Sequence, residues 1–283
     1  MIGIFDSGIG GLSVFREIYR LLPGEDYIYY ADSRHCPYGE KSREYVIGRS
    51  KEITEFLVRE GADIIVVACN TATAAAIGML RKAYSDPSAP GTCETVSMMS
   101  DGRRDHIMFI GMEPAVKPAA ELTRTGVVGV LATAGTLNGM KYKATREMFA
   151  KGIRVVEHVG AGFVELVEKG ITEGHEAEST VERSIRPLLD AGADVIVLGC
   201  THYPFLMETI RKAAGPSVSI IDPAPAVARH LADVMKEDGL LPHACINSTE
   251  AVEPLNTRPS VKLFSSGDGD ILKETFNTLI RKI

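Results

Sequence analysis

The segment AGADVIVLGCTHYP, Ala191 to Pro204, decides the fold of this chain. Four aliphatic residues, Val195 to Leu198, lie between two glycines, and this pattern predicts a buried parallel strand. An earlier segment, EGADIIVVACNTA at Glu60 to Ala72, repeats the pattern, so each predicted strand brings one cysteine to its carboxyl end. These cysteines, Cys69 and Cys200, suggest two half-domains that face each other across one site.

The two halves of the chain also begin alike. Ile2 to Phe5 and Val127 to Leu131 are short apolar runs, and each precedes a glycine-containing turn and then a helical pattern. These two runs are offset by about as many residues as the two cysteines, which indicates an internal duplication. Strands and helices alternate throughout, so we expect an α/β fold with doubly wound parallel sheets. In such sheets ligands bind at the carboxyl ends of the strands.

Length and composition limit the functions that this chain can have. A chain of 283 residues predicts two domains, and 45% hydrophobic with 24% charged residues is typical of a soluble globular protein. We expect no signal peptide and no membrane span, hence a cytoplasmic location. The net charge of −6 without a dense basic cluster disfavours nucleic acids and anionic membranes as partners. Five cysteines are an odd number, widely spaced, and we expect free thiols.

The cysteines fall into two groups. We expect Cys36, Cys93 and Cys245 to pack as small apolar side chains. Cys69 and Cys200 differ, because polar and hydroxyl residues follow each of them where a helix should start. The amides and the dipole of such a helix should lower a thiol pKa from its usual value of ~8.5.

Several cysteine chemistries are disfavoured. A tyrosine-phosphatase loop needs an arginine six residues after the cysteine, but those positions hold Ala75 and Leu206. A papain-type nucleophile does not explain a second cysteine, and disulfide exchange would need a CxxC pair. Metal binding by Cys200 and His202 lacks further ligands at useful spacing, so we predict no metal. Two facing thiols can instead move protons at one carbon: one removes a proton from one face, and the other returns a proton to the opposite face.

Other polar residues stand near the predicted strand ends. Asp6 heads the turn DSGIGG, where a carboxylate suits an ammonium group or a thiol that needs a base, and disfavours a polyphosphate. His202 follows Cys200 by two residues and is close enough to polarise that thiol. The sequence Pro37 to Gly39, PYG, offers amide donors and a phenol for a carboxylate, although it also reads as a simple turn.

Together these motifs resemble the glutamate racemase family, and the resemblance extends over almost the whole chain. It rests on DSGIGG, PYG, CNTA, GCTHYP and finally SSGD at Ser265 to Asp268. The resemblance implies a cofactor-independent enzyme that interconverts L- and D-glutamate and so supplies D-glutamate for peptidoglycan. It also implies a homodimer that acts on a small molecule and needs no pyridoxal phosphate.

The resemblance also implies roles for individual residues. Cys69 and Cys200 would be the two acid/base catalysts, with Asp6 assisting near Cys69 and His202 assisting near Cys200. The substrate's amino and carboxylate groups would be held by Asp6, Ser7, Tyr38, Gly39, Asn70, Thr71, Thr201 and His202. Thr133 and Glu168 resemble positions that line the family's pocket.

In this family the second domain is inserted in the first. We therefore expect a first domain of residues 1–112 and 223–283, a second of residues 113–222, and an active site in the cleft between them. Residues 86–105 are rich in turn formers and charge, and we expect a surface insertion or lid with little regular structure there. In LATAGT, Ala132 stands where the family often has glycine, which makes the expected backbone contact less secure.

Two rival functions remain open at this point. One is aspartate racemisation or another reaction of the same two-cysteine superfamily, against which His202 and the DSGIGG and PYG motifs argue. Polarimetry with both amino acids separates these two. The other rival is a non-catalytic amino-acid sensor or an inhibitory partner of another enzyme, and deuterium wash-in at Cα separates binding from catalysis.

Overall fold

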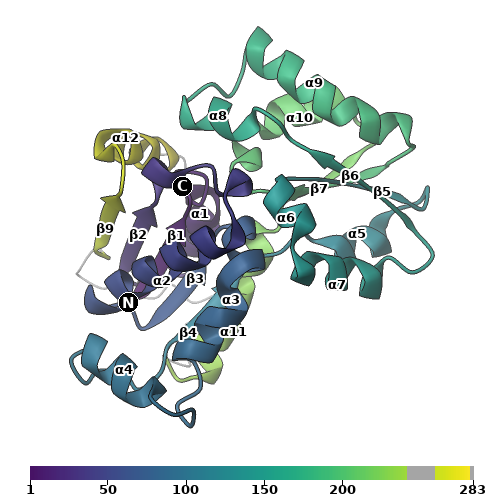
Figure 1. Ribbon diagram of the computed structural model, residues 1–283. Helices are drawn as coiled ribbons and strands as arrows, with labels where there is room; N and C mark the ends of the chain where they lie inside the picture. Colours follow the sequence, from purple (N-terminus) through teal and green to yellow (C-terminus); the bar gives the residue numbers. More distant parts are fainter. Residues whose placement is uncertain (241–258, 281–283) are drawn as a thin grey trace, which may run out of the picture.

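The structure, a computed structural model, describes residues 1–240 and 259–280, which form two α/β units (Figure 1). The first sheet has the strand order β4-β3-β1-β2-β9 and the second the order β6-β5-β7-β8. All paired strands are parallel. The predicted α/β class with two parallel sheets is confirmed. The strands are β1 (Ile2–Asp6), β2 (Tyr27–Ala31), β3 (Ile64–Val67), β4 (Met108–Gly111), β5 (Val127–Ala132), β6 (Arg154–Val159), β7 (Val195–Gly199), β8 (Ser219–Ile221) and β9 (Val261–Ser265).

The two sheets repeat one strand order. In the first sheet β1 lies between β2 and β3, and β4 follows β3; in the second, β5 lies between β6 and β7, and β8 follows β7. The duplicated segments therefore occupy matching strands, β3 and β7, next to the central strand of their repeat. Among the residues that the structure describes, β9 has no counterpart in the second sheet; it pairs with β2 at the edge of the first.

Helices cover the faces of both sheets (Figure 1). In the first unit α1 packs against α11 and α12, whereas α2 packs against α3. In the second unit α9 packs on β5, β6 and α10, and α5 packs on β5, β7 and α7. The helices are α1 (Leu12–Leu21), α2 (Arg43–Arg59), α3 (Asn70–Tyr84), α4 (Thr92–Met99), α5 (Val116–Leu122), α6 (Ala134–Asn138), α7 (Met140–Phe149), α8 (Phe163–Glu168), α9 (His175–Asp190), α10 (Met207–Ala214), α11 (Ala224–Glu237) and α12 (Gly269–Ile280). Three short 3-10 helices are η1 (Ser33–His35), η2 (Tyr38–Glu40) and η3 (Tyr203–Leu206).

The first sheet is buried on both faces. Along β1, Ile4 points into the core formed with α1 and α11, and Phe5 points into the core formed with α2 and α3. Both side chains are fully buried, as expected of a parallel strand with helices on each side. The cluster that contains Ile4 continues into the second unit through Leu131, Phe163 and Tyr203. The two units thus share one continuous apolar core.

Residues 86–105 are more regular than the sequence suggests. They contain α4, which follows Gly91 in a left-handed conformation and buries Val96 against the core of α2 and α3. The prediction of little regular structure is therefore wrong. Turn formers flank α4 rather than fill it, and one buried valine gives only a weak sequence signal. Met98 on the outer side of α4 is 80% exposed.

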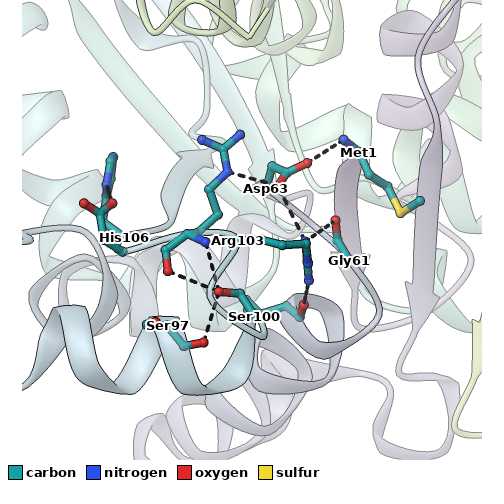
Figure 2. A network of polar contacts seen from close by, with 10 residues as sticks. Met1, Gly61, Asp63, Ser97, Ser100, Arg103 and His106 are labelled. Atoms are coloured by element: carbon teal, nitrogen blue, oxygen red, sulfur yellow. Dashed lines mark hydrogen bonds and ion pairs between the residues drawn. The ribbon is translucent and has the colours of Figure 1, made fainter.

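The end of this segment is fixed by charge (Figure 2). Arg104 Nε lies 3.0 Å from an oxygen of Asp63, and Arg103 lies 3.7 Å from the same oxygen. The amino group of Met1 contacts the other oxygen of Asp63 at 2.8 Å. Because Asp63 immediately precedes β3, these contacts hold the chain terminus and residues 103–104 at the amino end of that strand.

The structure corrects one further expectation. Cys93 on α4 is exposed, so it does not pack as a small apolar residue, while Cys36 is half-buried. Cys245 lies outside the described residues. Within the described ranges, every helix is too short or too polar to cross a bilayer.

Candidate active site

Cys69 and Cys200 line one small cavity at the carboxyl ends of the two sheets. Cys69 follows β3 by two residues, and Cys200 follows β7 directly. Both thiols are buried, with exposed fractions of 5% and 8%. Of the other predicted site residues, seven also line this cavity, as do Thr133, Pro37, Val164 and Gly199; the seven are Ser7, Tyr38, Gly39, Asn70, Thr71, Thr201 and His202. The structure therefore brings both duplicated strand ends and the PYG turn to one place.

Cys69 occupies the N-cap of α3. Its sulfur accepts a hydrogen bond from the Ala72 amide at 3.5 Å and lies 3.9 Å from the Ser7 hydroxyl. Burial and the nearby Asp6 carboxylate nonetheless raise the pKa of the Cys69 thiol well above its usual range, and the Ala72 amide lowers it by less. The helix amide lowers this pKa as expected, but one amide does not compensate for the loss of water, so the expected net lowering is wrong.

Cys200 has a different local setting. It is followed by a turn and η3 rather than by an α-helix, so the prediction of a helix start directly after this cysteine is wrong. The nearest polar partner of its sulfur is Nδ1 of His202, at 3.8 Å. The imidazole replaces the helix terminus as the group that can compensate a negative charge on this sulfur.

His202 is part of a buried polar chain. Its Nε2 lies 2.6 Å from a carboxylate oxygen of Glu168, and that same oxygen accepts a hydrogen bond from the Ile9 amide at 2.8 Å. Burial alone lowers the pKa of His202, but hydrogen bonds to Cys200, Cys36 and Glu168 outweigh it and hold the pKa well above its usual range. These hydrogen bonds favour the protonated form of His202.

The glycine turn after β1 makes room for this histidine. A Cβ atom on Gly10 would lie 2.3 Å from Nδ1 of His202, far inside contact distance. His202 is 1% exposed, so the ring has no space to move away. The DSGIGG turn therefore needs glycine here for close approach of a side chain from the second unit.

Asp6 lies beneath the cavity and contacts both units. One carboxylate oxygen accepts hydrogen bonds from the Gly11 amide at 2.7 Å and from the Thr201 hydroxyl at 3.2 Å. Burial raises the pKa of Asp6, against the charge of His202 and several hydrogen bonds that lower it. Its other oxygen, Oδ1, is buried without a hydrogen-bond partner among the described residues. Asp6 thus lies near both halves of the site rather than near Cys69 alone.

Asn70 offers an unused amide. Both its side-chain oxygen and nitrogen are buried, and neither has a partner in the described part of the chain. A buried amide without partners costs free energy of about 1–3 kcal/mol. Because Asn70 is only 3% exposed and lines the cavity, a polar ligand bound there would recover that cost.

The hydroxyl groups of three threonines meet at the cavity wall. Thr71 at the start of α3 lies 2.8 Å from Thr133 and 3.3 Å from Thr136, which also contact each other at 3.0 Å. Thr71 belongs to the first repeat, whereas Thr133 is the N-cap of α6 and Thr136 lies within α6, directly after β5. This cluster links the two units and places Thr133 in the site; Thr136 was not identified from the sequence.

The phenol of Tyr38 is already engaged. It donates a hydrogen bond to Asp32 at 2.6 Å, and Asp32 forms an ion pair with Arg49 at 2.8 Å. A phenol has one proton to donate, so the predicted donation to a ligand carboxylate is wrong for this hydroxyl. The ring of Tyr38 and the backbone of Gly39 remain at the cavity.

Cys36, like Thr136, was not predicted as a site residue from the sequence. It precedes the PYG turn in the loop after β2, which is itself the carboxyl end of a parallel strand. This position at a strand end is the sequence signal that could have identified Cys36 as a site residue. Sulfur, imidazole and carboxylate atoms of Cys36, His202 and Glu168 lie within 4.8 Å of one another and form a group that could hold a metal ion.

The cavity itself is small. Its volume is about 10 Å³, close to the space that one water molecule needs. Contacts between the units surround it, including the Ser13 hydroxyl, which donates to the carbonyl of Thr201 at 2.9 Å. A ligand larger than water can enter only if the two units move apart.

The chain is similar in sequence and in structure to proteins of known function. Residues 102–231 match the family model Asp/Glu/Hydantoin racemase. A glutamate racemase of Ectopseudomonas mendocina is 44% identical over 267 residues, which is 94% of this chain and 89% of that protein. A solved glutamate racemase of Bacillus anthracis superposes with a TM-score of 0.80 at 29% identity, covering 99% of this chain and 94% of that one. The Escherichia coli glutamate racemase, solved with L-glutamate and the activator UDP-MurNAc-Ala, superposes with a TM-score of 0.72 at 31% identity, covering 99% of this chain and 94% of that one.

Proposed function

We propose that this chain, which belongs to the glutamate racemase family, interconverts L- and D-glutamate and supplies D-glutamate for peptidoglycan synthesis. The observation that carries the mechanism is the pair of buried thiols, Cys69 and Cys200, which reach one cavity from matching strands of two repeats. Inversion at a carbon needs an acid/base group on each face, and the repeat supplies two such groups.

The proposed reaction moves one proton off Cα and another onto it. In one direction a Cys200 thiolate removes the Cα proton, and the Cys69 thiol gives its proton to the opposite face. In the reverse direction the two sulfurs exchange roles. The raised pKa of Cys69 keeps that sulfur protonated, and the His202 imidazolium can compensate charge on Cys200. Each direction of the reaction needs one sulfur protonated and the other deprotonated when turnover begins.

We propose that the remaining polar groups hold the substrate. The orphaned amide of Asn70 and the amides at the start of α3 suit a carboxylate, because a helix N-terminus favours anions. The unpartnered oxygen of Asp6 suits the ammonium group. Further positioning groups are the hydroxyls of Ser7, Thr71 and Thr201, the backbone of Gly39, and the Thr133 and Glu168 side chains.

Entry of glutamate requires opening of the cavity. We propose that residues 1–112 with 223–283 move as one unit and residues 113–222 as the other. The contacts that must separate join the two units directly: Thr71 to Thr133 at 2.8 Å, Ile9 to Glu168 at 2.8 Å, and Asp6 to Thr201 at 3.2 Å. Closure around the substrate then excludes water from the carbanion-like transition state.

Deuterium wash-in tests this function. L-glutamate, D-glutamate and L-aspartate are incubated separately with the protein in D2O, and deuterium at Cα is followed by NMR together with optical rotation. We expect both glutamate enantiomers to gain deuterium and to racemise, with little reaction of aspartate. Binding of glutamate without exchange would make the protein a sensor, and preferential exchange of aspartate would make it an aspartate racemase.

Two finer properties belong to the same proposal. We propose a cytoplasmic location, which suits the four free cysteines of the described residues. We also propose a homodimer, since Met140 and Met148 on α7 expose 84% and 65% of their surfaces and offer apolar area for association. Light scattering of the purified chain, with polar substitutions of both methionines, tests the second point.

A further inference from the structure

A cluster of three potential metal ligands lies beside the proposed catalytic thiols. Cys36 comes from the loop after β2, Glu168 ends α8, and His202 follows β7. One sulfur, one carboxylate oxygen and one ring nitrogen of this cluster all lie within 4.8 Å of one another. Cys36 and Glu168 do not line the cavity of the two thiols, so only His202 is shared between the two groups.

The ligand types favour zinc. Thiolate, imidazole and carboxylate are the three ligands that Zn²⁺ takes in proteins, and three protein ligands with one open position are common. Magnesium and calcium prefer sites made of oxygen atoms alone. Bond lengths of about 2.0–2.3 Å place the ligand atoms of a tetrahedral zinc about 3.5 Å apart. Side-chain movements of about 1 Å reach that spacing. Nε2 of His202 and the carboxylate oxygen of Glu168, 2.6 Å apart, move apart, while atoms separated by up to 4.8 Å in the cluster move closer.

The backbone next to the cluster leaves room for it. A Cβ atom on Gly8 would lie 2.1 Å from Oε1 of Glu168 and 3.3 Å from Sγ of Cys36. Gly8 therefore serves the cluster itself, because any larger residue would displace two of the three ligands. This space is a second observation, independent of the residue types, that points to a built site.

The surrounding hydrogen bonds are also those of a metal site. The Ile9 amide orients the Glu168 carboxylate at 2.8 Å. The Nδ1 atom of His202, on the other side of the ring from Glu168, faces the Thr201 hydroxyl at 3.5 Å and the Cys200 sulfur at 3.8 Å. Metal-bound histidines usually donate their second ring N–H in this way, which fixes the ring.

A route from solvent reaches the cluster. Glu168 lines a second cavity of about 1280 Å³, which lies between α1, α10 and α12 and is separate in its lining from the cavity of the thiols. The Glu168 side chain is 22% exposed, and Cys36 is half-buried. A small ion can therefore approach from this side without passing Cys69.

We propose that Cys36, Glu168 and His202 bind Zn²⁺ reversibly and that this binding inhibits the enzyme. On binding, the Cys36 thiol releases its proton to solvent and the metal takes the place of the proton between His202 and Glu168. The ring of His202 then carries the metal in place of its Nε2 proton, so it is no longer a protonated imidazole beside Cys200. The metal also ties α8 to the loop after β2, so the two units cannot part. The inhibition rests on the proposed racemase function, but the metal site does not.

Cobalt tests the site without reference to catalysis. Co²⁺ is added to the full chain, and the sulfur-to-cobalt charge-transfer absorption is measured in wild type and in Cys36→Ser, Cys69→Ser and Cys93→Ser. We expect one bound Co²⁺ per chain in wild type, removal of the band by Zn²⁺, and retention of the band in Cys69→Ser and in the exposed-site control Cys93→Ser. Cys36→Ser should lose the band while its thermal unfolding stays like that of wild type.

Two results would overturn the site. One is a wild-type band that survives in Cys36→Ser and disappears in Cys69→Ser, which would assign the metal to the catalytic thiols. The other is the absence of a wild-type band. A Gly8→Ala variant gives an independent check, since it leaves all cysteines in place and should weaken Co²⁺ binding.

Activity then tests the inhibition. Zn²⁺ should inhibit wild-type racemisation, EDTA should reverse it, and Cys36→Ser should need at least about tenfold more Zn²⁺ for half-inhibition. Equal inhibition of Cys36→Ser and wild type would contradict the proposal. A wild type that binds Co²⁺ but racemises neither enantiomer of glutamate would instead disprove the proposed function and leave the metal site standing.

Discussion

The two copies of the repeated segment, GADIIVVAC at 61–69 and GADVIVLGC at 192–200, have the same backbone role and different chemical surroundings. Each forms the strand next to the central strand of its sheet. Cys69 caps an α-helix and lies near the Asp6 carboxylate, whereas Cys200 precedes a turn and contacts the His202 imidazole. Duplication thus places two sulfurs symmetrically, and single neighbours then give them opposite electrostatic environments.

The aspartates that precede the two repeated strands, Asp63 and Asp194, also have different surroundings. Asp63 is surrounded by cations: the amino terminus, Arg103 and Arg104. Asp194 instead accepts hydrogen bonds mainly from hydroxyls and amides of residues 123–125. In both copies the aspartate before the strand holds neighbouring chain segments at the strand's amino end. Asp63 does so through ion pairs, and Asp194 does so mainly through hydrogen bonds from neutral groups.

We expect the largest effect when one of the two sulfurs, that of Cys69 or that of Cys200, is removed. Cys69→Ser and Cys200→Ser should each lower racemisation by at least about 10²-fold, because positioned acid/base groups contribute about 10²–10⁴. Each variant should retain slow exchange of the Cα proton from only one enantiomer, and the two variants should retain opposite ones. NMR wash-in from D2O measures this. Racemisation at the wild-type rate by either variant contradicts the two-thiol mechanism.

Removal of the imidazole tests whether the two sulfurs are tuned differently. His202→Asn should slow turnover by roughly 10–100-fold, mainly in the step that uses Cys200. Racemisation has an equilibrium constant of unity, so kcat/KM must stay equal in both directions. The asymmetry should therefore appear as a larger Cα-deuterium isotope effect for one enantiomer than for the other.

Glu168→Gln is the matched control for that experiment. It keeps the shape beside His202 but removes the negative charge that lies 2.6 Å from Nε2. We expect a smaller change in the same direction. Isotope effects that remain equal for both enantiomers in both variants would show that His202 does not distinguish the two halves.

The paired aspartates allow a test by stability, pH and salt. Asp63→Asn and Asp194→Asn should each cost about 1–3 kcal/mol, since hydrogen bonds to a charged group are lost. High salt should reduce the cost for Asp63, whose partners are cations, more than for Asp194. Thermal unfolding midpoints of both variants at low and high salt measure this difference. Equal salt dependence would contradict the distinction between the two sites.

Acid should act on both aspartates with the same sign. Hydrogen bonds from the amino terminus and Arg104 outweigh burial and lower the pKa of Asp63. Hydroxyl and amide donors likewise outweigh burial and lower the pKa of Asp194 to about 2. A lowered pKa in the folded state stabilises the fold above the ordinary value of 3.8, and this contribution is lost as pH falls from 3.8 toward about 2. The wild-type midpoint should fall in that window more steeply than the midpoint of Asp194→Asn.

We expect the smallest effect from a substitution in the segment that follows β5, which corresponds to the turn after β1. At the end of β1, Asp6 brings a buried carboxylate, and after β5 Thr133 and Thr136 bring hydroxyls. Thr136→Val keeps the shape and removes one hydroxyl, so we expect about 1 kcal/mol of lost stability and a few-fold rise in KM. An unchanged KM, measured beside the surface control Cys93→Ser, would show that this cluster only joins the units.

Much of the fold follows from the sequence because duplicated apolar strands have few alternatives. GADxIVxxC at two places and glycine turns after two opening strands were enough to predict matching parallel sheets and a shared site at their carboxyl ends. α4 was not predicted, because its only buried apolar anchor is Val96 and turn formers surround it. Local patterns do not reveal a short helix that is stabilised mainly by its tertiary contacts with α2 and α3.

The position of the site could be predicted from the sequence, but the pKa shifts and hydrogen-bond partners of its residues could not. Strand-end residues such as Ser7, Asn70 and Thr201 line the cavity as the pattern of parallel strands requires. The raised pKa of Cys69 depends on its burial and on the nearby Asp6 carboxylate, and the engagement of the Tyr38 hydroxyl depends on Asp32. Both are properties of tertiary packing, which residue spacing along the chain does not specify. The roles assigned to these residues are predictions that the substitutions above test.

The position of β9 sets an order for biosynthesis. Val261–Ser265 pairs with Tyr27–Ala31 at the edge of the first sheet, so a strand that is synthesised late completes a sheet begun by much earlier residues. α11, at Ala224–Glu237, packs on α1 and is also made late. The second unit is already synthesised at that point, and domains generally fold as units during synthesis. The first sheet therefore stays incomplete in the nascent chain until α11 and β9 have been synthesised.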